Sequence, residues 1–125
     1  VKPHVHIHSA WYVLQQAGDY NPIHLHTNAE FSCIGYLKMP DGIEEEWVKD
    51  GEDHYPANGH IEFMYGSPTF LSRSTFMVRP KVGDFFIFPS DMYHMVYPFR
   101  GAGERRSFSA NIVISDQRGK TNGTE

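Results

Sequence analysis

The sequence has one cysteine, no long apolar run and no cluster of basic residues. Because Cys33 stands alone, the chain cannot form an internal disulfide framework, which fits a reducing compartment. No apolar stretch approaches the ~18 residues of a membrane span, and no secretion signal is visible. The formal net charge of −4 argues against binding of a nucleic-acid duplex. We expect a cytoplasmic protein without a membrane partner, and the start at Val1 rather than methionine leaves room for an upstream segment.

The sequence is instead rich in aromatic and turn-forming residues. Its 125 residues predict one domain with its own core, at residues 1–115, followed by a polar tail at 116–125. Nine Phe, seven Tyr and two Trp favour strands, while 11 Gly and 8 Pro favour turns. About eight strands are expected, at residues 3–15, 22–27, 31–38, 60–65, 69–79, 84–89, 93–99 and 105–115. This pattern is typical of an all-β sandwich, jelly roll or barrel with little helix.

The stretch between residues 39 and 60 is the least regular part of the sequence. It is polar and interrupted by glycine and proline, and we expect it to have few apolar anchors. A loop of about 20 residues is long enough to act as a lid. A short helix over residues 43–49 is compatible with the pattern.

Eight histidines are a high count, and they are the compositional feature that most suggests metal binding. His24 and His26 are separated by one residue, so in a strand both point to one side, ~6–7 Å apart. Two imidazoles at that spacing can bind one metal ion, and Glu30 follows four residues later. His94 is a distant partner near the other end of the chain. Together these residues predict a mononuclear metal site.

A second histidine row offers a rival metal site. His4, His6 and His8 alternate with apolar residues, so in a strand they share one face. No fourth ligand is visible near them. We therefore interpret this row as the polar face of a strand near a free end.

Two spacings in the chain resemble the two cupin motifs. The first motif would comprise Gly18, His24-x-His26 and Glu30, and the second Gly83, Pro89-x-Asp91 and His94. A closer resemblance covers residues 9–112. The segments SAWYVLQQAGDYNPIHLH, FSCIGYLKMP, IEFMYG and PKVGDFFIFPSDMYHMVYPFRGAGERRSFSANI resemble 2-oxoglutarate/Fe(II) oxygenases found in phage and marine sequences. That resemblance implies a double-stranded β-helix, the barrel that cupins share, with Fe(II), 2-oxoglutarate and O₂ as cofactor and cosubstrates.

The resemblance also implies roles for individual residues. His24, His26 and His94 would be catalytic metal ligands, with Glu30 as a further candidate ligand. Arg105 would bind the distal carboxylate of 2-oxoglutarate, supported by Tyr36 and Ser107. Arginine suits this task because its planar fork matches a carboxylate bidentately.

The alternation of side chains along a strand indicates which of the two neighbouring arginines could bind the carboxylate. Arg105 shares a face with Ser107, Ser109 and Asn111, whereas Arg106 shares the opposite face with Phe108 and Ile112. The polar row could line a cavity. Alternatively, the apolar row faces the core and the polar row faces solvent.

The ligand set departs from the usual pattern. Non-haem Fe(II) oxygenases of this type use two histidines and one carboxylate. Here His26 stands where the acidic residue would be. Either the site has three histidines, or Glu30 supplies the carboxylate, and we favour Glu30.

The leading functional hypothesis is an Fe(II)/2-oxoglutarate-dependent dioxygenase. It would hydroxylate a small molecule or a side chain while 2-oxoglutarate is decarboxylated to succinate. The alternative is a cupin-type metal protein: an isomerase, a keto-acid-independent dioxygenase or a small-molecule-binding module. A third reading is a metal-free binding barrel. The sequence leaves open the substrate and whether the chain forms a homodimer.

Overall fold

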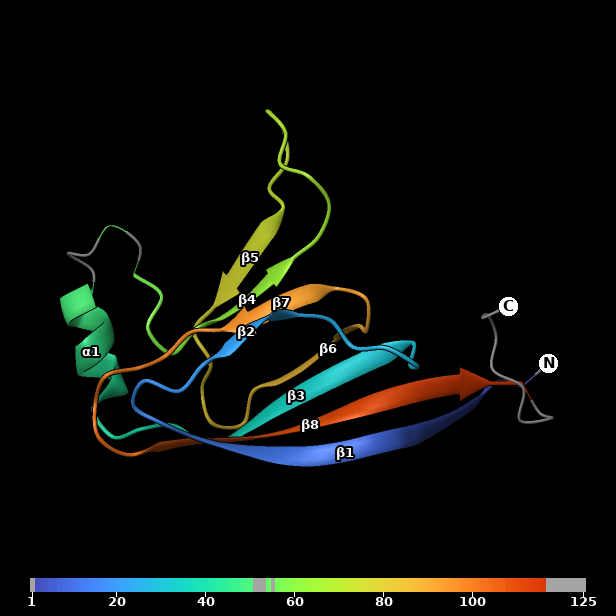
Figure 1. Cartoon of the computed structure of the whole chain (residues 1–125), viewed down its shortest axis with the longest axis horizontal. Helices are drawn as coiled ribbons and strands as arrows, with labels where there is room; N and C mark the ends of the chain where they lie inside the picture. Colours follow the sequence, from blue (N-terminus) through green and yellow to red (C-terminus); the bar gives the residue numbers. More distant parts are fainter. Residues whose placement is uncertain (1, 51–53, 55, 117–125) are drawn as a thin grey trace.

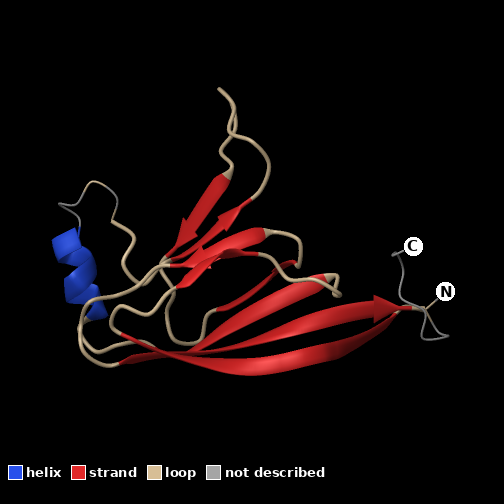
Figure 2. Cartoon of the chain, viewed as in Figure 1, coloured by secondary structure: helices blue, strands red, loops and turns tan. Residues whose placement is uncertain are grey.

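The computed structural model of the chain describes residues 2–50, 54 and 56–116. Its regular secondary structure is almost entirely strand, with one short helix at one end of the molecule (Figure 2). The elements are β1 (His4–Gln16), β2 (Asn21–His24), β3 (Phe31–Lys38), α1 (Ile43–Asp50), β4 (Ile61–Met64), β5 (Thr75–Val78), β6 (Phe85–Pro89), β7 (Tyr93–Val96) and β8 (Glu104–Ser115). The polar tail expected at residues 116–125 lies, apart from Asp116, outside the described residues.

The strands form two four-stranded antiparallel sheets (Figure 1). Their orders are β1-β8-β3-β6 and β2-β7-β4-β5, so the chain passes from one sheet to the other at most steps. Two facing sheets of eight strands with this winding form a jelly roll, the double-stranded β-helix. The predicted all-β fold class is therefore confirmed.

The hydrophobic core lies between the two sheets. Its buried members come from both, with Ile34 and Tyr36 on β3 facing Ile61 and Phe63 on β4. Ile61 is fully buried, at 0% exposure. Strands that bury one face in this way alternate apolar and polar residues, which is why the sequence pattern located them.

Three predicted strands extend well past the observed ones, and the one expected at residues 93–99 ends at Val96. Only Thr75–Val78 of the expected strand at residues 69–79 pairs with β4, because a bridge between Thr69 and Ser72 closes a turn before it. The expected strand at residues 22–27 ends at His24, so His26 lies beyond β2. Pro22 has no N–H to donate, and β2 is an edge strand whose register shifts between Asn21 and His24. The assumption that His24 and His26 share one strand face is therefore wrong.

The segment between β3 and β4 is better anchored than the sequence suggested. The helix α1 confirms the expected short helix, but the expectation of few apolar anchors is wrong. Ile43 and Trp47 are buried and pack against Phe99. The Trp47 indole Nε1 also donates a hydrogen bond of 2.6 Å to the carbonyl oxygen of Asn58. The lid prediction in part concerns residues 51–53 and 55, which lie outside the described residues.

Gly35 in β3 lies beneath an aromatic ring on the outer face of the first sheet. It pairs with Phe108 on β8 and with Phe85 on β6, and these two rings stack at 6.0 Å between centroids. A Cβ atom at Gly35 would collide with the Phe108 ring. The missing side chain therefore leaves room for this cross-strand aromatic contact.

We expect Gly35→Ala to displace the Phe108 ring and to lower the free energy of unfolding by about 1 kcal/mol, the typical worth of an aromatic pair. In a Phe108→Ala background the same substitution should be neutral or stabilising, because alanine is favoured over glycine within a strand. Urea denaturation of the four proteins in this double-mutant cycle measures the difference. An equal loss of stability in both backgrounds would refute the explanation.

Candidate active site

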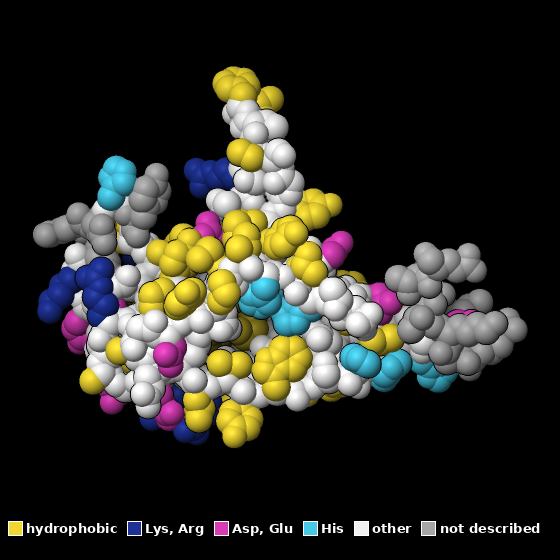
Figure 3. All heavy atoms as spheres, in the orientation of Figure 1, with side chains coloured by type: hydrophobic (Ala, Val, Ile, Leu, Met, Phe, Trp, Pro, Cys, Tyr) yellow, Lys and Arg dark blue, Asp and Glu magenta, His cyan; other side chains and the backbone are white. Residues whose placement is uncertain are grey.

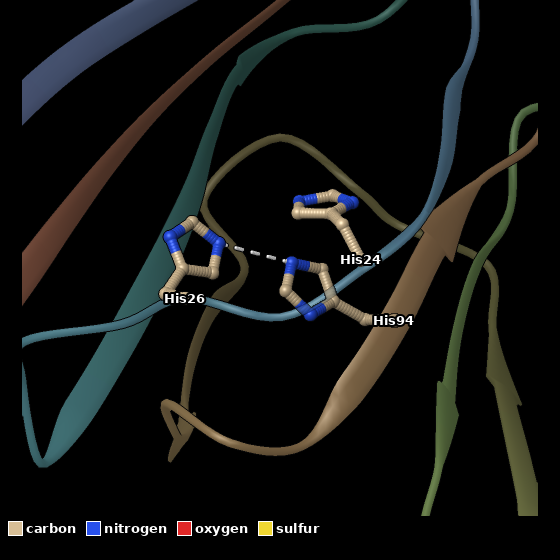
Figure 4. Close-up of side chains that lie close together, drawn as sticks. All are labelled: His24, His26 and His94. Atoms are coloured by element: carbon tan, nitrogen blue, oxygen red, sulfur yellow. Dashed lines mark hydrogen bonds between the residues drawn. The ribbon is translucent and has the colours of Figure 1, made fainter.

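Three histidine side chains converge between the sheets. His24 is the last residue of β2, His94 lies opposite it on β7, and His26 follows two residues after His24. Their ligand-capable ring atoms all lie within 4.8 Å of one another. Figure 4 shows the three rings turned toward one another, with Nε2 of His26 and Nε2 of His94 3.2 Å apart. Among the described residues, no other group of three or more His, Cys, Asp or Glu side chains is placed to hold a metal ion.

Backbone carbonyls orient two of these rings. Nδ1 of His24 lies 2.7 Å from the carbonyl oxygen of Pro22, and Nδ1 of His94 lies 3.1 Å from that of Met92. A carbonyl oxygen can only accept, so each Nδ1 carries the proton and each Nε2 presents a lone pair. This arrangement resembles the way metal-binding histidines are held in proteins.

Two of the rings, those of His26 and His94, are held in the neutral form that metal binding requires. Burial lowers the pKa of His94 to about 4, and the neighbouring His24 and His26 act in the same direction against a hydrogen bond to Met92. Burial and then His24 also lower the pKa of His26. Neutral imidazole nitrogens are suitable ligands for iron and for other transition metals. The donor set therefore fits a single transition-metal ion and leaves coordination positions open to further ligands.

Glu30 is not part of this group. Its carboxylate Oε2 accepts a hydrogen bond of 2.7 Å from the backbone N–H of Ile114, and its own N–H donates to Ile112. These contacts tie the start of β3 to the end of β8. The ligand set that we propose therefore contains three histidines and omits Glu30.

The rival row on β1 does not converge in this way. His4, His6 and His8 are all exposed, and they do not form a cluster of ligand atoms among the described residues. A register shift between Ile7 and Ser9 breaks the alternation at His8. This placement agrees with a polar strand surface.

A cavity of about 40 Å³ adjoins the three histidines. Figure 3 shows histidine side chains near the middle of one face of the molecule, among apolar side chains. Besides the histidines and apolar residues, the cavity is lined by the polar side chains of Gln15, Asn21, Tyr36, Arg105, Ser107 and Ser109. Three members of the polar row of β8, Arg105, Ser107 and Ser109, thus face the cavity, whereas Phe108 lies on the outer face of the sheet.

Arg105 is buried at this cavity, and none of the described carboxylates pairs with it. It is 1% exposed, and its guanidinium donates to Gln15 Oε1 and to the carbonyl oxygens of Gly59 and Tyr97. All of these acceptors are neutral, and no ion pair joins Arg105 to a described residue. Burial lowers its pKa, partly offset by Tyr36 and Asp19, yet an arginine remains protonated at neutral pH. A buried charge of this kind favours the arrival of an anion.

Arg106 has the opposite orientation. Its side chain is exposed, and Nη2 lies 2.6 Å from Oε1 of Glu104. Successive strand residues point to opposite faces, which explains why only one of the two arginines enters the cavity.

Tyr36 adds an unsatisfied hydrogen-bond donor to the cavity lining. Its hydroxyl is buried and has no hydrogen-bond partner among the described residues. Burial raises its pKa well above the usual range, so the phenol keeps its proton. Tyr36 pairs with Ser107 across the β3–β8 ladder, beside Arg105. Buried hydroxyls are rarely left without an acceptor, so a ligand that supplies one is expected here.

Sequence reasoning missed the contribution of β1 to this site. Trp11, Val13 and Gln15 line the cavity, and the Trp11 ring stacks on His26 at 5.6 Å between centroids. Their shared parity on β1 was visible in the sequence. Nothing local indicated that this face meets the histidines.

The sequence matches the model of a family described as "Putative 2OG-Fe(II) oxygenase" over residues 9–111. Among solved structures, the fold is similar to a 2OG-Fe(II) oxygenase family oxidoreductase from Burkholderia pseudomallei, with 16% identity, a TM-score of 0.64, and coverage of 90% of this chain and 46% of that one. It is also similar to a Pseudomonas putida prolyl-4-hydroxylase, with 21% identity, a TM-score of 0.54, and coverage of 82% and 49%. This chain thus spans about half the length of these solved proteins. No curated protein matches the sequence significantly.

Proposed function

Because this chain belongs to the 2OG-Fe(II) oxygenase family, we propose that it is an Fe(II)- and 2-oxoglutarate-dependent dioxygenase that hydroxylates a small molecule or a side chain. The observation that carries the proposal is a single cavity whose lining combines two complementary groups. Three histidine rings converge at it, and it is also lined by a buried arginine that has no carboxylate partner among the described residues. A keto acid that binds a metal at one end and carries a carboxylate at the other matches both.

His24, His26 and His94 would hold the iron. An imidazole that binds a metal is an uncharged ligand, so three of them leave the 2+ charge of the ion uncompensated. A site with that charge attracts an anionic ligand more strongly than one that already contains a carboxylate. A dianionic keto acid therefore complements a three-histidine centre.

Arg105, Tyr36 and Ser107 would hold the distal carboxylate. The guanidinium supplies charge, and the Tyr36 hydroxyl gains the acceptor that it lacks in this structure. When bound, iron and 2-oxoglutarate supply the oxidising chemistry, in which O₂ is consumed, 2-oxoglutarate yields succinate and CO₂, and one oxygen atom enters the substrate. The apolar side chains of the cavity would limit access of water to that chemistry.

Formation of succinate from 2-oxoglutarate tests the proposal. The purified protein with Fe(II), 2-oxoglutarate and O₂ should form succinate in an O₂-dependent manner, and candidate small molecules and peptides should raise the rate. The His94→Ala protein provides the background. Succinate formation no faster than that background would count against a dioxygenase.

The three-histidine donor set also favours a second candidate function. A cupin-type metal protein that acts without a keto acid, as an isomerase or a keto-acid-independent dioxygenase, would need no carboxylate ligand. Such a protein has no use for a buried arginine at the cavity. Binding of 2-oxoglutarate therefore separates the two functions.

Tyr36→Phe should affect the free protein and the complex in opposite ways. Without ligand, the free energy of unfolding should stay the same or rise, because an unpaired buried hydroxyl costs about 1–3 kcal/mol. Affinity for 2-oxoglutarate should fall by roughly tenfold or more, the worth of a hydrogen bond to a charged group. Urea denaturation and anaerobic titration of the Fe(II) protein measure the two effects. Lower stability with unchanged affinity would show that the hydroxyl serves the fold and not the cosubstrate.

A further inference from the structure

Gln15 occupies one edge of the Arg105 guanidinium. Its amide oxygen Oε1 accepts hydrogen bonds from Nε at 3.0 Å and from Nη2 at 2.8 Å. These adjacent N–H groups form a fork of the kind that binds a carboxylate bidentately. A neutral oxygen thus lies where a carboxylate oxygen of a ligand would lie. Gln15 is only 5% exposed and lines the same cavity as Tyr36 and Ser107.

The other donors of Arg105 are held by the backbone. Nη1 donates to the carbonyl oxygen of Gly59 at 2.9 Å, and Nη1 and Nη2 share that of Tyr97 at 3.3 Å. A backbone carbonyl cannot turn away without moving its loop, whereas a glutamine side chain can change rotamer. The remaining side-chain contact of Gln15, from Nε2 to Asn21 Oδ1, is long at 3.5 Å. Gln15 is therefore the acceptor that can most readily leave.

The chemical type of residue 15 matters as much as its position. An amide oxygen satisfies the two N–H groups without neutralising the guanidinium. A carboxylate in the same place would form a permanent ion pair with Arg105 and compete with any incoming anion. Among side chains of this length, glutamine keeps the arginine both ordered and available.

We propose that Gln15 is a positioning residue whose amide oxygen stands in for the cosubstrate carboxylate. In the free protein, Gln15 accepts hydrogen bonds from Nε and Nη2 of Arg105. When 2-oxoglutarate binds, the Gln15 side chain changes rotamer, and both N–H groups then donate to the distal carboxylate of the ligand. This inference rests on the proposed function. It adds that residue 15 sets the availability of the arginine to an anion.

The test compares charge and shape at this one position. Gln15→Glu keeps the length of the side chain and adds a carboxylate, so 2-oxoglutarate should bind the Fe(II) protein ~100-fold more weakly. Gln15→Met removes the stand-in at similar volume, so affinity should equal or exceed that of the wild type. Gln16→Glu adds the same charge at the neighbouring exposed residue, and its affinity should be unchanged. Anaerobic titration with 2-oxoglutarate gives the affinities, and iron content with thermal melting shows whether each variant is intact.

The two variants separate the stand-in role from a purely structural one. If Gln15→Glu binds 2-oxoglutarate within about threefold of the wild type, the inference is overturned while the proposed function stands. If Gln15→Met weakens binding as much as Gln15→Glu, the glutamine only supports the fold, and the inference is again overturned. A wild-type protein that binds iron but not 2-oxoglutarate would reject the proposed function and this inference together.

Discussion

Replacing His94 with alanine is expected to abolish stoichiometric iron binding. His94 is the one ligand of the proposed centre that comes from β7, and it is also the most buried, at 5% exposure. Its ring is oriented by Met92, so its loss removes a preorganised ligand. Even disturbing a residue that merely supports a ligand lowers metal affinity by about 10–100-fold, so losing the ligand should cost more. Elemental analysis after dialysis against limiting Fe(II) measures the change.

His6→Ala is the matched control for this experiment. His6 belongs to the exposed row on β1, so its removal should leave iron content unchanged. If His94→Ala folds poorly because its ring packs on Phe88, His94→Gln keeps more of the volume and still removes the imidazole. Full iron occupancy in either His94 variant would remove the histidine cluster as the metal site. Loss of iron from His6→Ala would point to the rival row.

Arg105→Ala should weaken 2-oxoglutarate binding by roughly 30-fold or more while iron still binds. Losing a buried charged contact costs about 2–5 kcal/mol, and each ~1.4 kcal/mol is tenfold in affinity. The proposed iron ligands lie on β2, just after β2 and on β7, not on β8, so the metal should stay. The absorption band of the iron–keto-acid chelate, titrated without O₂, reports the affinity.

Two further variants sharpen this experiment. Arg105→Lys keeps the charge but loses the fork, so its affinity should lie between those of the wild type and Arg105→Ala. Arg106→Ala should behave as the wild type, because Arg106 is exposed and paired with Glu104. Thermal melting is needed in parallel, since loss of Arg105 leaves Gln15 and two carbonyl oxygens without their donor. Equal affinities in the wild type and Arg105→Ala would favour the keto-acid-independent cupin function.

The sequence predicted those parts of the fold that depend on local pattern. The alternation of apolar and polar residues located the strands, and strand parity separated Arg105 from Arg106. The close spacing of His24 and His26 indicated the cluster even though β2 ends at His24. In that case the residue types were informative, while the assumed strand geometry was wrong.

Contacts between distant segments could not be predicted in the same way. Glu30 was a reasonable ligand candidate by spacing, but its carboxylate accepts a hydrogen bond from the backbone N–H of Ile114, 84 residues away in the sequence. Gln15 is the last residue of the expected strand at residues 3–15, and its partner Arg105 lies 90 residues downstream. Such pairings follow from strand order across the sheets, which a single sequence does not reveal.

The most direct test of the proposed site is a crystal structure of the protein, from crystals grown without O₂ in the presence of Fe(II) and 2-oxoglutarate. We expect one iron bound by His24, His26 and His94, with the keto acid on the metal and its distal carboxylate on Arg105 and Tyr36. Gln15 should have turned away from the guanidinium. Iron bound elsewhere, or a keto acid that does not reach Arg105, would contradict the proposed site.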